Sequence, residues 1–252
     1  MNSPAVKQRW IEGTVAAQRR WTGRLFSLMV EADIAFEAGQ FAKLGLQVEG
    51  EMLARPYSFV NAPGERPHEF YYVTLPGGPL TQRLCTLQAG DRIYLAPRPA
   101  GFLALSEVPD GENLWLVSTG TGIGPFLSIL KTEAPWSRFR QVVLVHAVRL
   151  AEELTHRDTV ERLLRRHPGQ MRAVSFVSRE ASAEALPGRI PAAIEDGRLE
   201  SRTGVVLSAE KSQVMICGNP DMVRDTSAAL ARRGMKKHRR RDPGHITVEN
   251  YW

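Results

Sequence analysis

Residues 113–130, NLWLVSTGTGIGPFLSIL, place a glycine-rich loop between two apolar runs. The first run has the length of a buried strand, and the second, which opens on Pro125, is typical of a helix whose first turn tolerates proline. Glycines let a backbone turn sharply and approach a ligand with no Cβ in the way, and the amino end of a helix favours anions. Pro125 stands where the GxGxxG dinucleotide fingerprint has its third glycine, so this is a phosphate-type loop of another kind. Taken alone, the loop also fits a simple strand–helix turn.

The chain around this loop alternates between strand-like and helix-like segments. Alternation of apolar strands with helices predicts a parallel sheet with helices on both faces. The predicted strands are QVVLVHAV (141–148), MRAVSFVS (171–178) and SQVMICG (212–218), and the predicted helices cover residues 152–167 and 221–234.

The first 105 residues have a different pattern of apolar and turn-forming residues. Short β-branched or alternating runs at 20–32, 40–48, 69–75 and 91–97 are separated by the turn-rich segments GER, PGGP and AGD. Closely spaced short strands with Gly and Pro breaks predict an antiparallel β-barrel, with one short helix at Leu80–Leu87. We therefore expect two domains, residues 1–105 and 106–252, with a ligand cleft between them.

Composition narrows the class of protein. The 252 residues are 43% hydrophobic and 24% charged, which is ordinary for a globular chain. No apolar stretch could span a membrane and the amino terminus does not read as a secretory signal, so we expect a cytoplasmic location. Cys85 and Cys217, the two cysteines, cannot build a Cys-rich zinc site or an all-cysteine iron–sulfur cluster.

Positive charge is concentrated in one stretch. The net charge is +6, and the segment Arg232–Arg241 (RRGMKKHRRR) holds seven Lys and Arg with no acid, so the remainder carries −1. This segment is either a solvated surface or a positively charged binding surface for an acidic partner. No recognisable nucleic-acid module accompanies it.

Three further groups of residues could carry chemistry. Residues 55–58 (RPYS) offer an arginine for a phosphate, a ring and a hydroxyl, and Cys217-Gly-Asn-Pro220 leaves room for a flat ring at a strand end. Arg149 and Arg179 follow two predicted strands, and with Arg189 they could grip a phosphate monoester. Singly, these groups are also compatible with a turn, a buried cysteine and solvated arginines.

Taken in order along the chain, these stretches resemble the ferredoxin–NADP⁺ reductases, and most closely their bacterial ferredoxin/flavodoxin–NADP⁺ reductase branch. The resemblance covers nearly the whole chain. In the first half, RPYS (55–58) is similar to the flavin-binding RxYS motif, and residues 69–91 and 99–105 are similar to the rest of the flavin domain. In the second half, STGTGIGPFLSIL (118–130) and CGNPDMV (217–223) are similar to motifs of the nicotinamide domain. The tail GHITVENYW (244–252) is similar to the tail of the bacterial members.

The resemblance implies an FAD-binding barrel followed by an NADP(H)-binding domain. By motif position, Arg55 faces the FAD pyrophosphate, Tyr57 packs on the isoalloxazine, and Ser58 lies near flavin N5. The residues implied to be nearest the chemistry are Ser58, Cys217 and Tyr251. The further residues implied to hold FAD or NADP(H) are Tyr72, Val73, Thr74, Leu80, Thr81, Thr121, Gly122, Arg149, Ser178, Arg179, Arg189, Gly218, Asn219, Asp221, Met222, Tyr251 and Trp252.

The implied reaction is hydride transfer between NADPH and FAD N5, coupled to one-electron transfer to or from ferredoxin or flavodoxin. These acidic partners give the Arg232–Arg241 segment a purpose, which is to steer them to the cleft. The family implies a monomer, and we expect no nucleic-acid or membrane partner. The alternatives are a free-flavin reductase, the reductase component of an oxygenase, or a binder of nucleic acid or membrane surfaces through the basic segment.

The tail ends on two aromatic residues. Tyr251 and Trp252 are either hydrophobic anchors or covers for the cofactor. The resemblance implies that Tyr251 lies at the isoalloxazine and that Trp252 stacks on the adenine of FAD.

Overall fold

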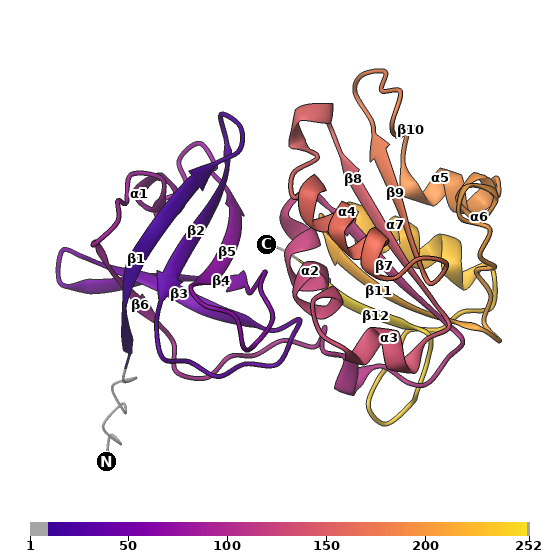
Figure 1. The fold of residues 1–252 in the computed structure, drawn as a ribbon, viewed down its shortest axis with the longest axis horizontal. Helices are drawn as coiled ribbons and strands as arrows, with labels where there is room; N and C mark the ends of the chain where they lie inside the picture. The colour runs from indigo at the N-terminus through magenta and orange to yellow at the C-terminus, as the bar shows by residue number, and fades with distance from the viewer. Residues whose placement is uncertain (1–9, 251–252) are drawn as a thin grey trace, which may run out of the picture.

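The computed structural model describes residues 10–250 and contains two six-stranded sheets that lie side by side (Figure 1). The first is antiparallel, in the order β4-β3-β6-β1-β2-β5, and the second is parallel, in the order β10-β9-β8-β7-β11-β12. Both parts of the predicted fold are therefore confirmed. None of the helices between residues 10 and 250 has the length and apolar composition needed to cross a membrane.

The antiparallel sheet curls into a barrel that is not closed by a continuous ladder. Its edge strands β4 and β5 meet through an isolated bridge between Phe59 and Phe70. Leu80 and Leu84, at either end of helix α1, are buried in the barrel core. The strands are β1 (Ile11–Arg20), β2 (Leu25–Glu31), β3 (Phe41–Val48), β4 (Glu51–Ser58), β5 (His68–Val73) and β6 (Arg92–Leu95), with α1 at Thr81–Leu84 between β5 and β6.

The parallel sheet is covered by helices on both faces. Leu114 and Leu116 of β7 lie in one buried cluster with α2, whereas Trp115 and Val117 lie in another with α5 to α7, as the period of two in a strand requires. The strands are β7 (Asn113–Thr119), β8 (Gln141–Val148), β9 (Met171–Val177), β10 (Leu186–Pro187), β11 (Ser212–Gly218) and β12 (Ile246–Asn250). The helices are η1 (Leu105–Glu107), η2 (Gly120–Ile123), α2 (Gly124–Leu130), α3 (Ala134–Arg138), η3 (Ala151–Glu153), α4 (Arg157–Arg166), α5 (Ile190–Glu195), α6 (Arg198–Thr203) and α7 (Pro220–Ala231).

Several element boundaries differ from the prediction. Helix α1 ends at Leu84 rather than Leu87, because Thr86 and Leu87 donate to residues three positions back and tighten the chain into turns. Helix α4 begins at Arg157 rather than residue 152, since His156 takes a left-handed conformation with φ +57°. The sequence did not reveal β1, α3, β10, α5, α6 or the edge strand β12.

One apolar cluster joins the barrel to the parallel sheet. Val60 and Tyr71 of the barrel are buried in the same cluster as Ile123 and Phe126, which lie at the start of the α2 face. The buried Ser128 hydroxyl, on α2, also donates to the Asn61 carbonyl at 2.7 Å. Helix α2 therefore lies on the side of the parallel sheet that faces the barrel (Figure 1).

Candidate active site

The carboxyl ends of β7 and β11 bring the two nicotinamide-domain motifs together. Cys217 pairs with Ser118, so the CGNP turn lies directly beside the start of the glycine loop. A Cβ on Gly122 would lie 2.6 Å from the Cys217 carbonyl oxygen, and one on Gly218, where φ is +136°, would collide with Thr119. Only glycine allows this close backbone contact at both positions.

Hydrogen bonds fix the same contact. The Asn219 N–H donates to Thr119 Oγ1 at 3.0 Å, which ties the CGNP turn to the glycine loop. Asn219 Oδ1 accepts the backbone N–H groups of Asp221 and Met222, so this side chain is the amino-terminal cap of α7. The asparagine of CGNP thus caps the helix that follows.

His146 of β8 also contacts the glycine loop, through a hydrogen bond to its backbone. It is buried, and its Nε2 lies 3.0 Å from the carbonyl oxygen of Gly120, a residue with φ +53°. A carbonyl only accepts, so Nε2 carries the proton. Burial lowers the pKa of His146 to about 4, and the Gly120 hydrogen bond only partly opposes this shift. The ring is therefore neutral near pH 7.

The predicted phosphate-binding arginines follow three adjacent strands. Arg149 comes after β8, Arg179 after β9 and Arg189 after β10, and the Arg179 N–H donates to the Arg149 carbonyl at 2.9 Å. All three side chains are exposed, and none takes part in an ion pair within residues 10–250. Ser178, between them, donates through N and Oγ to the Val148 carbonyl. The three exposed guanidinium groups fit an anionic group such as a phosphate monoester.

The flavin motif lies on the edge strand β4. Arg55 is exposed and donates to the Ala54 carbonyl at 2.7 Å, and the half-buried Tyr57 ring meets Tyr72 edge to face at 6.0 Å. Burial raises the pKa of Tyr57 to about 12 against the opposing charge of Arg55, so its hydroxyl stays neutral. Ser58 ends the strand in a buried position. An exposed guanidinium beside a partly open ring fits a diphosphate joined to a flat ring system.

The strand β5 and helix α1 present their predicted residues in different ways. Tyr72 is turned into the barrel core, where it stacks on Phe26 and donates to Gln18 Oε1 at 2.6 Å. Val73 points the other way and packs against the cluster shared with the parallel sheet. Thr74 is buried against the Arg24 carbonyl. Leu80 buries its side chain in the barrel, and Thr81 Oγ1 accepts from the Leu75 N–H at 3.2 Å.

Comparison with known proteins agrees with this arrangement. The family described as oxidoreductase NAD-binding domain matches residues 116–228. A flavodoxin/ferredoxin–NADP reductase of Escherichia coli (strain K12) is 49% identical over 245 residues, covering 96% of this chain and 99% of that protein. A ferredoxin–NADP reductase of Pseudomonas aeruginosa is 33% identical, covering 93% and 95%.

The chain belongs to the flavodoxin/ferredoxin–NADP reductase family.

A solved structure supports the same assignment. The crystal structure of a ferredoxin NADP⁺ reductase from Neisseria gonorrhoeae, with bound FAD and NADP, matches with a TM-score of 0.92 and 34% identity, covering 96% of this chain and 99% of that one. Members of this reductase family are FAD- and NADP-dependent oxidoreductases, so the resemblance inferred from the sequence is confirmed.

Sequence reasoning missed one acidic residue of this reductase. Glu249 lies on β12 in register with Cys217, and its Oε2 accepts from the Phe102 N–H at 3.1 Å. Burial raises the pKa of its carboxyl, and the hydrogen bond from Phe102 only partly opposes this. The residue pattern of ITVEN, in which polar and apolar residues alternate, could have revealed the strand and thereby the glutamate at its end. Tyr251 and Trp252 lie outside the described residues.

Most of the basic segment is neutralised locally. Arg232 pairs with Glu195, Arg233 with Glu200, Lys236 with Asp242, and Arg240 with Glu107. Arg240 also lies over the Phe102 ring at 5.5 Å. No ion pair within residues 10–250 involves Lys237, Arg239 or Arg241, and all three are exposed.

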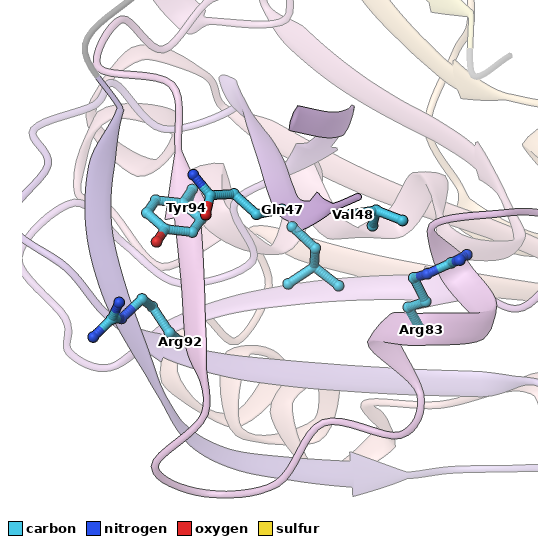
Figure 2. Close-up of a pocket in the computed structure, with 6 residues that line it drawn as sticks. Gln47, Val48, Arg83, Arg92 and Tyr94 are labelled. Carbon is cyan, nitrogen blue, oxygen red and sulfur yellow. The ribbon is translucent and has the colours of Figure 1, made fainter. Parts of the chain in front are cut away.

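A separate hollow of about 430 Å³ lies on the barrel, between β3, β6 and α1 (Figure 2). Figure 2 shows Arg83 on one side and Arg92 and Tyr94 on the other. Arg92 pairs with Glu12 at 3.0 Å, and Arg83 donates to the Pro79 carbonyl at 2.7 Å. None of the predicted cofactor-binding residues lines this hollow.

Proposed function

We propose that the protein catalyses electron transfer between NADPH and ferredoxin or flavodoxin through FAD held against the barrel. The observation that carries this proposal is the meeting of the two motifs of the parallel sheet at one edge, with three exposed arginines on the adjacent strand ends. The names of the relatives and the bound FAD and NADP of the gonococcal reductase support it.

The residue roles follow from charge and position. Arg55 binds the FAD pyrophosphate and Tyr57 packs on the flavin ring, while Thr121 and Cys217 border the nicotinamide. Arg149, Arg179 and Arg189 bind the 2′-phosphate, which makes NADPH the preferred donor over NADH. When bound, FAD would accept one hydride, which carries two electrons, and pass these electrons on one at a time.

The side chains of the protein position the reactants and exclude water. Gly122 and Gly218 let the glycine loop and the CGNP turn lie in close backbone contact, which a Cβ at either position would prevent. Glu249 holds a proton to higher pH than an exposed glutamate, since its carboxyl is desolvated beside Cys217. No strong general base is required for hydride transfer, and Tyr57 stays neutral.

We propose that residues 1–105 form the FAD-binding domain and 106–252 the NADP(H)-binding domain. We further propose that the acidic acceptor docks on the basic surface that includes Lys237, Arg239 and Arg241. The pairing of the other basic side chains of Arg232–Arg241 with acids of the chain argues against a dedicated binder of nucleic acid or membrane lipid.

The decisive experiment is a visible spectrum of the purified protein before and after anaerobic addition of NADPH. We expect a bound flavin whose absorbance is bleached by NADPH and much more slowly by NADH. A colourless protein that does not bind added FAD would refute the proposal.

A second assay separates the proposed function from a free-flavin reductase or an oxygenase component. We expect ferredoxin or flavodoxin to stimulate NADPH-driven reduction of cytochrome c. Stimulation by free flavin, with none by either protein, would favour the rival function.

A further inference from the structure

A chain of polar contacts crosses from the barrel to the loop before α4. His156 Nε2 lies 2.9 Å from Glu69 Oε1, which also accepts from the Ser27 hydroxyl at 2.6 Å. The Ser27 oxygen in turn accepts from Trp21 Nε1 at 2.9 Å. Glu69, Ser27 and Trp21 belong to the barrel, whereas His156 belongs to the half of the chain that forms the parallel sheet.

The other side of the imidazole makes a second connection. His156 Nδ1 lies 3.0 Å from Thr155 Oγ1, and the Thr155 hydroxyl donates to the Tyr71 hydroxyl at 2.8 Å. The imidazole also packs against two barrel rings, with centroids 4.5 Å from Trp21 and 4.8 Å from Tyr71. Both nitrogens of His156 are therefore hydrogen-bonded, one to Glu69 of the barrel and the other to Thr155, and its ring contacts two barrel rings.

Burial makes the Glu69 carboxylate depend on His156 as its partner. The side chain of His156 is 5% exposed and that of Glu69 is 17% exposed. Burial by itself would raise the pKa of Glu69, but the hydrogen bond and charge of His156, with help from Ser27, hold it below its usual value. A carboxylate in this position needs its partner, because an unpaired buried charge is strongly unfavourable. Glu69 therefore needs both its barrel partner Ser27 and His156 from the other half of the chain.

The pair is placed where it can align the two halves of the active site. His156 ends the loop that begins with Arg149, and Glu153 within this loop accepts the Arg149 and Leu150 N–H groups at 2.9 and 3.2 Å. On β5, Glu69, Tyr71 and Val73 share one face, the face toward the parallel sheet. His156 has a left-handed backbone conformation, which is uncommon for residues other than glycine, and its ring contacts Tyr71 on that face at 4.8 Å.

We propose that Glu69 and His156 are positioning residues that fix the Arg149–His156 loop against β5, so that the nicotinamide held by one half meets the flavin held by the other. The proposal rests on the proposed function, since it names how that site keeps its two cofactors in register. Neither Glu69 nor His156 is among the residues assigned above to FAD or NADP(H), so the pair acts through β5 and the Arg149–His156 loop.

The test compares Glu69→Gln, His156→Leu and the double variant in the FAD-loaded protein. We expect each single variant to slow flavin reduction by NADPH about tenfold to a hundredfold under anaerobic stopped flow, because a misalignment near 1 Å has effects of that size. The double variant should be no more than about twofold slower than the slower single variant, because the two residues act as one unit. Independent, additive losses would overturn the proposal.

A positioning role also predicts what does not change. Flavin content should equal that of the parent, and electron transfer from dithionite-reduced flavin to ferredoxin or flavodoxin should keep its rate, since that step does not involve nicotinamide. If this step slows as much as flavin reduction by NADPH, the pair is merely structural. The matched control is Glu184→Gln, which breaks the exposed pair with the neighbouring Arg157 (2.6 Å) and should leave both rates unchanged.

A readout independent of turnover is the indole N–H resonance of Trp21 in the NMR spectrum. In both single variants this resonance should shift, since Trp21 contacts the His156 ring and reaches Glu69 through Ser27. An unchanged resonance in His156→Leu would overturn the inference. Failure of the parent protein itself to bind FAD or to be reduced by NADPH would instead refute the proposed function.

Discussion

The proposed nucleotide half of the active site is made of strand ends and backbone, whereas the proposed flavin half is made of side chains that meet because a sheet curls. In the first, a glycine loop, a CGNP turn and three arginines follow neighbouring parallel strands. In the second, Tyr57 of β4 meets Tyr72 of β5, although these strands stand at opposite edges of the sheet. Substitutions in the glycine loop and the CGNP turn should therefore act through backbone geometry, whereas those at the arginines and in the flavin half should act through single side chains.

The largest expected effect concerns His146, the side chain that holds the loop backbone. The folded-state pKa of about 4 lies below the unfolded value near 6.5, so only the unfolded chain takes up this proton between these pH values. Stability from this source is complete above pH 6.5 and falls by roughly 3 kcal/mol as the pH drops to 4. Urea unfolding at pH 7, 5.5 and 4.5 should show a shallower loss for His146→Gln. An identical slope in both proteins would contradict the expected neutral ring.

Gly122→Ala tests the claim that backbone contact builds the nucleotide half. Its Cβ would lie 2.6 Å from the Cys217 carbonyl oxygen, which forces the loop and the CGNP turn apart. We expect flavin reduction by NADPH to slow by about thirtyfold with FAD still bound. Gly64→Ala is the control, because its Cβ would meet nothing within 4 Å. Loss of FAD in Gly122→Ala would show that the two halves cannot be separated in this way.

Arg189→Ala tests the side chains at the strand ends. Charge-assisted hydrogen bonds contribute about 1.5–3 kcal/mol, so the KM for NADPH should rise by at least about tenfold while that for NADH changes little. The exposed Arg202 of α6 supplies the control variant Arg202→Ala. Equal effects on the two nucleotides would rule out a 2′-phosphate contact at Arg189.

Arg55→Gln tests the flavin half. Removing this guanidinium should weaken FAD binding by about tenfold, measured by titrating apoprotein with FAD and following flavin fluorescence. The KM for NADPH should not change, which would separate this half from the arginines of the strand ends. Arg98→Gln, on an exposed barrel loop, is the control. An unaltered FAD affinity would remove Arg55 from the site.

The smallest effect is expected in the basic segment. Arg239→Gln combined with Arg241→Gln should slow reduction of an acidic ferredoxin or flavodoxin by about two- to fivefold at low salt, because steering of exposed charges is screened as ionic strength rises. Arg240→Gln should do less, since its guanidinium is already paired with Glu107. Stopped-flow rates across a salt series would show the difference. Salt-independent rates in all variants would place docking elsewhere.

Much of the nucleotide half could be predicted from the sequence because its parts are local. The glycine loop follows β7 directly, CGNP follows β11, and parallel strands bring their carboxyl ends to one edge. Arg149 and Arg179 could be assigned to that edge for the same reason. Helix α4 begins at Arg157 rather than at the predicted residue 152, because His156 adopts a left-handed conformation that no residue pattern indicated.

The sequence by itself determined the order of the two sheets, the family and the residue types gathered at the strand ends, because hydrophobic periodicity and glycine spacing are properties of short segments. The tertiary structure alone decided which distant groups meet. It set Glu249 beside Cys217, paired Arg240 with Glu107, and joined Glu69 to His156 across 87 positions of the chain. Contacts of this kind depend on how the barrel and the parallel sheet pack, and no local pattern encodes that packing.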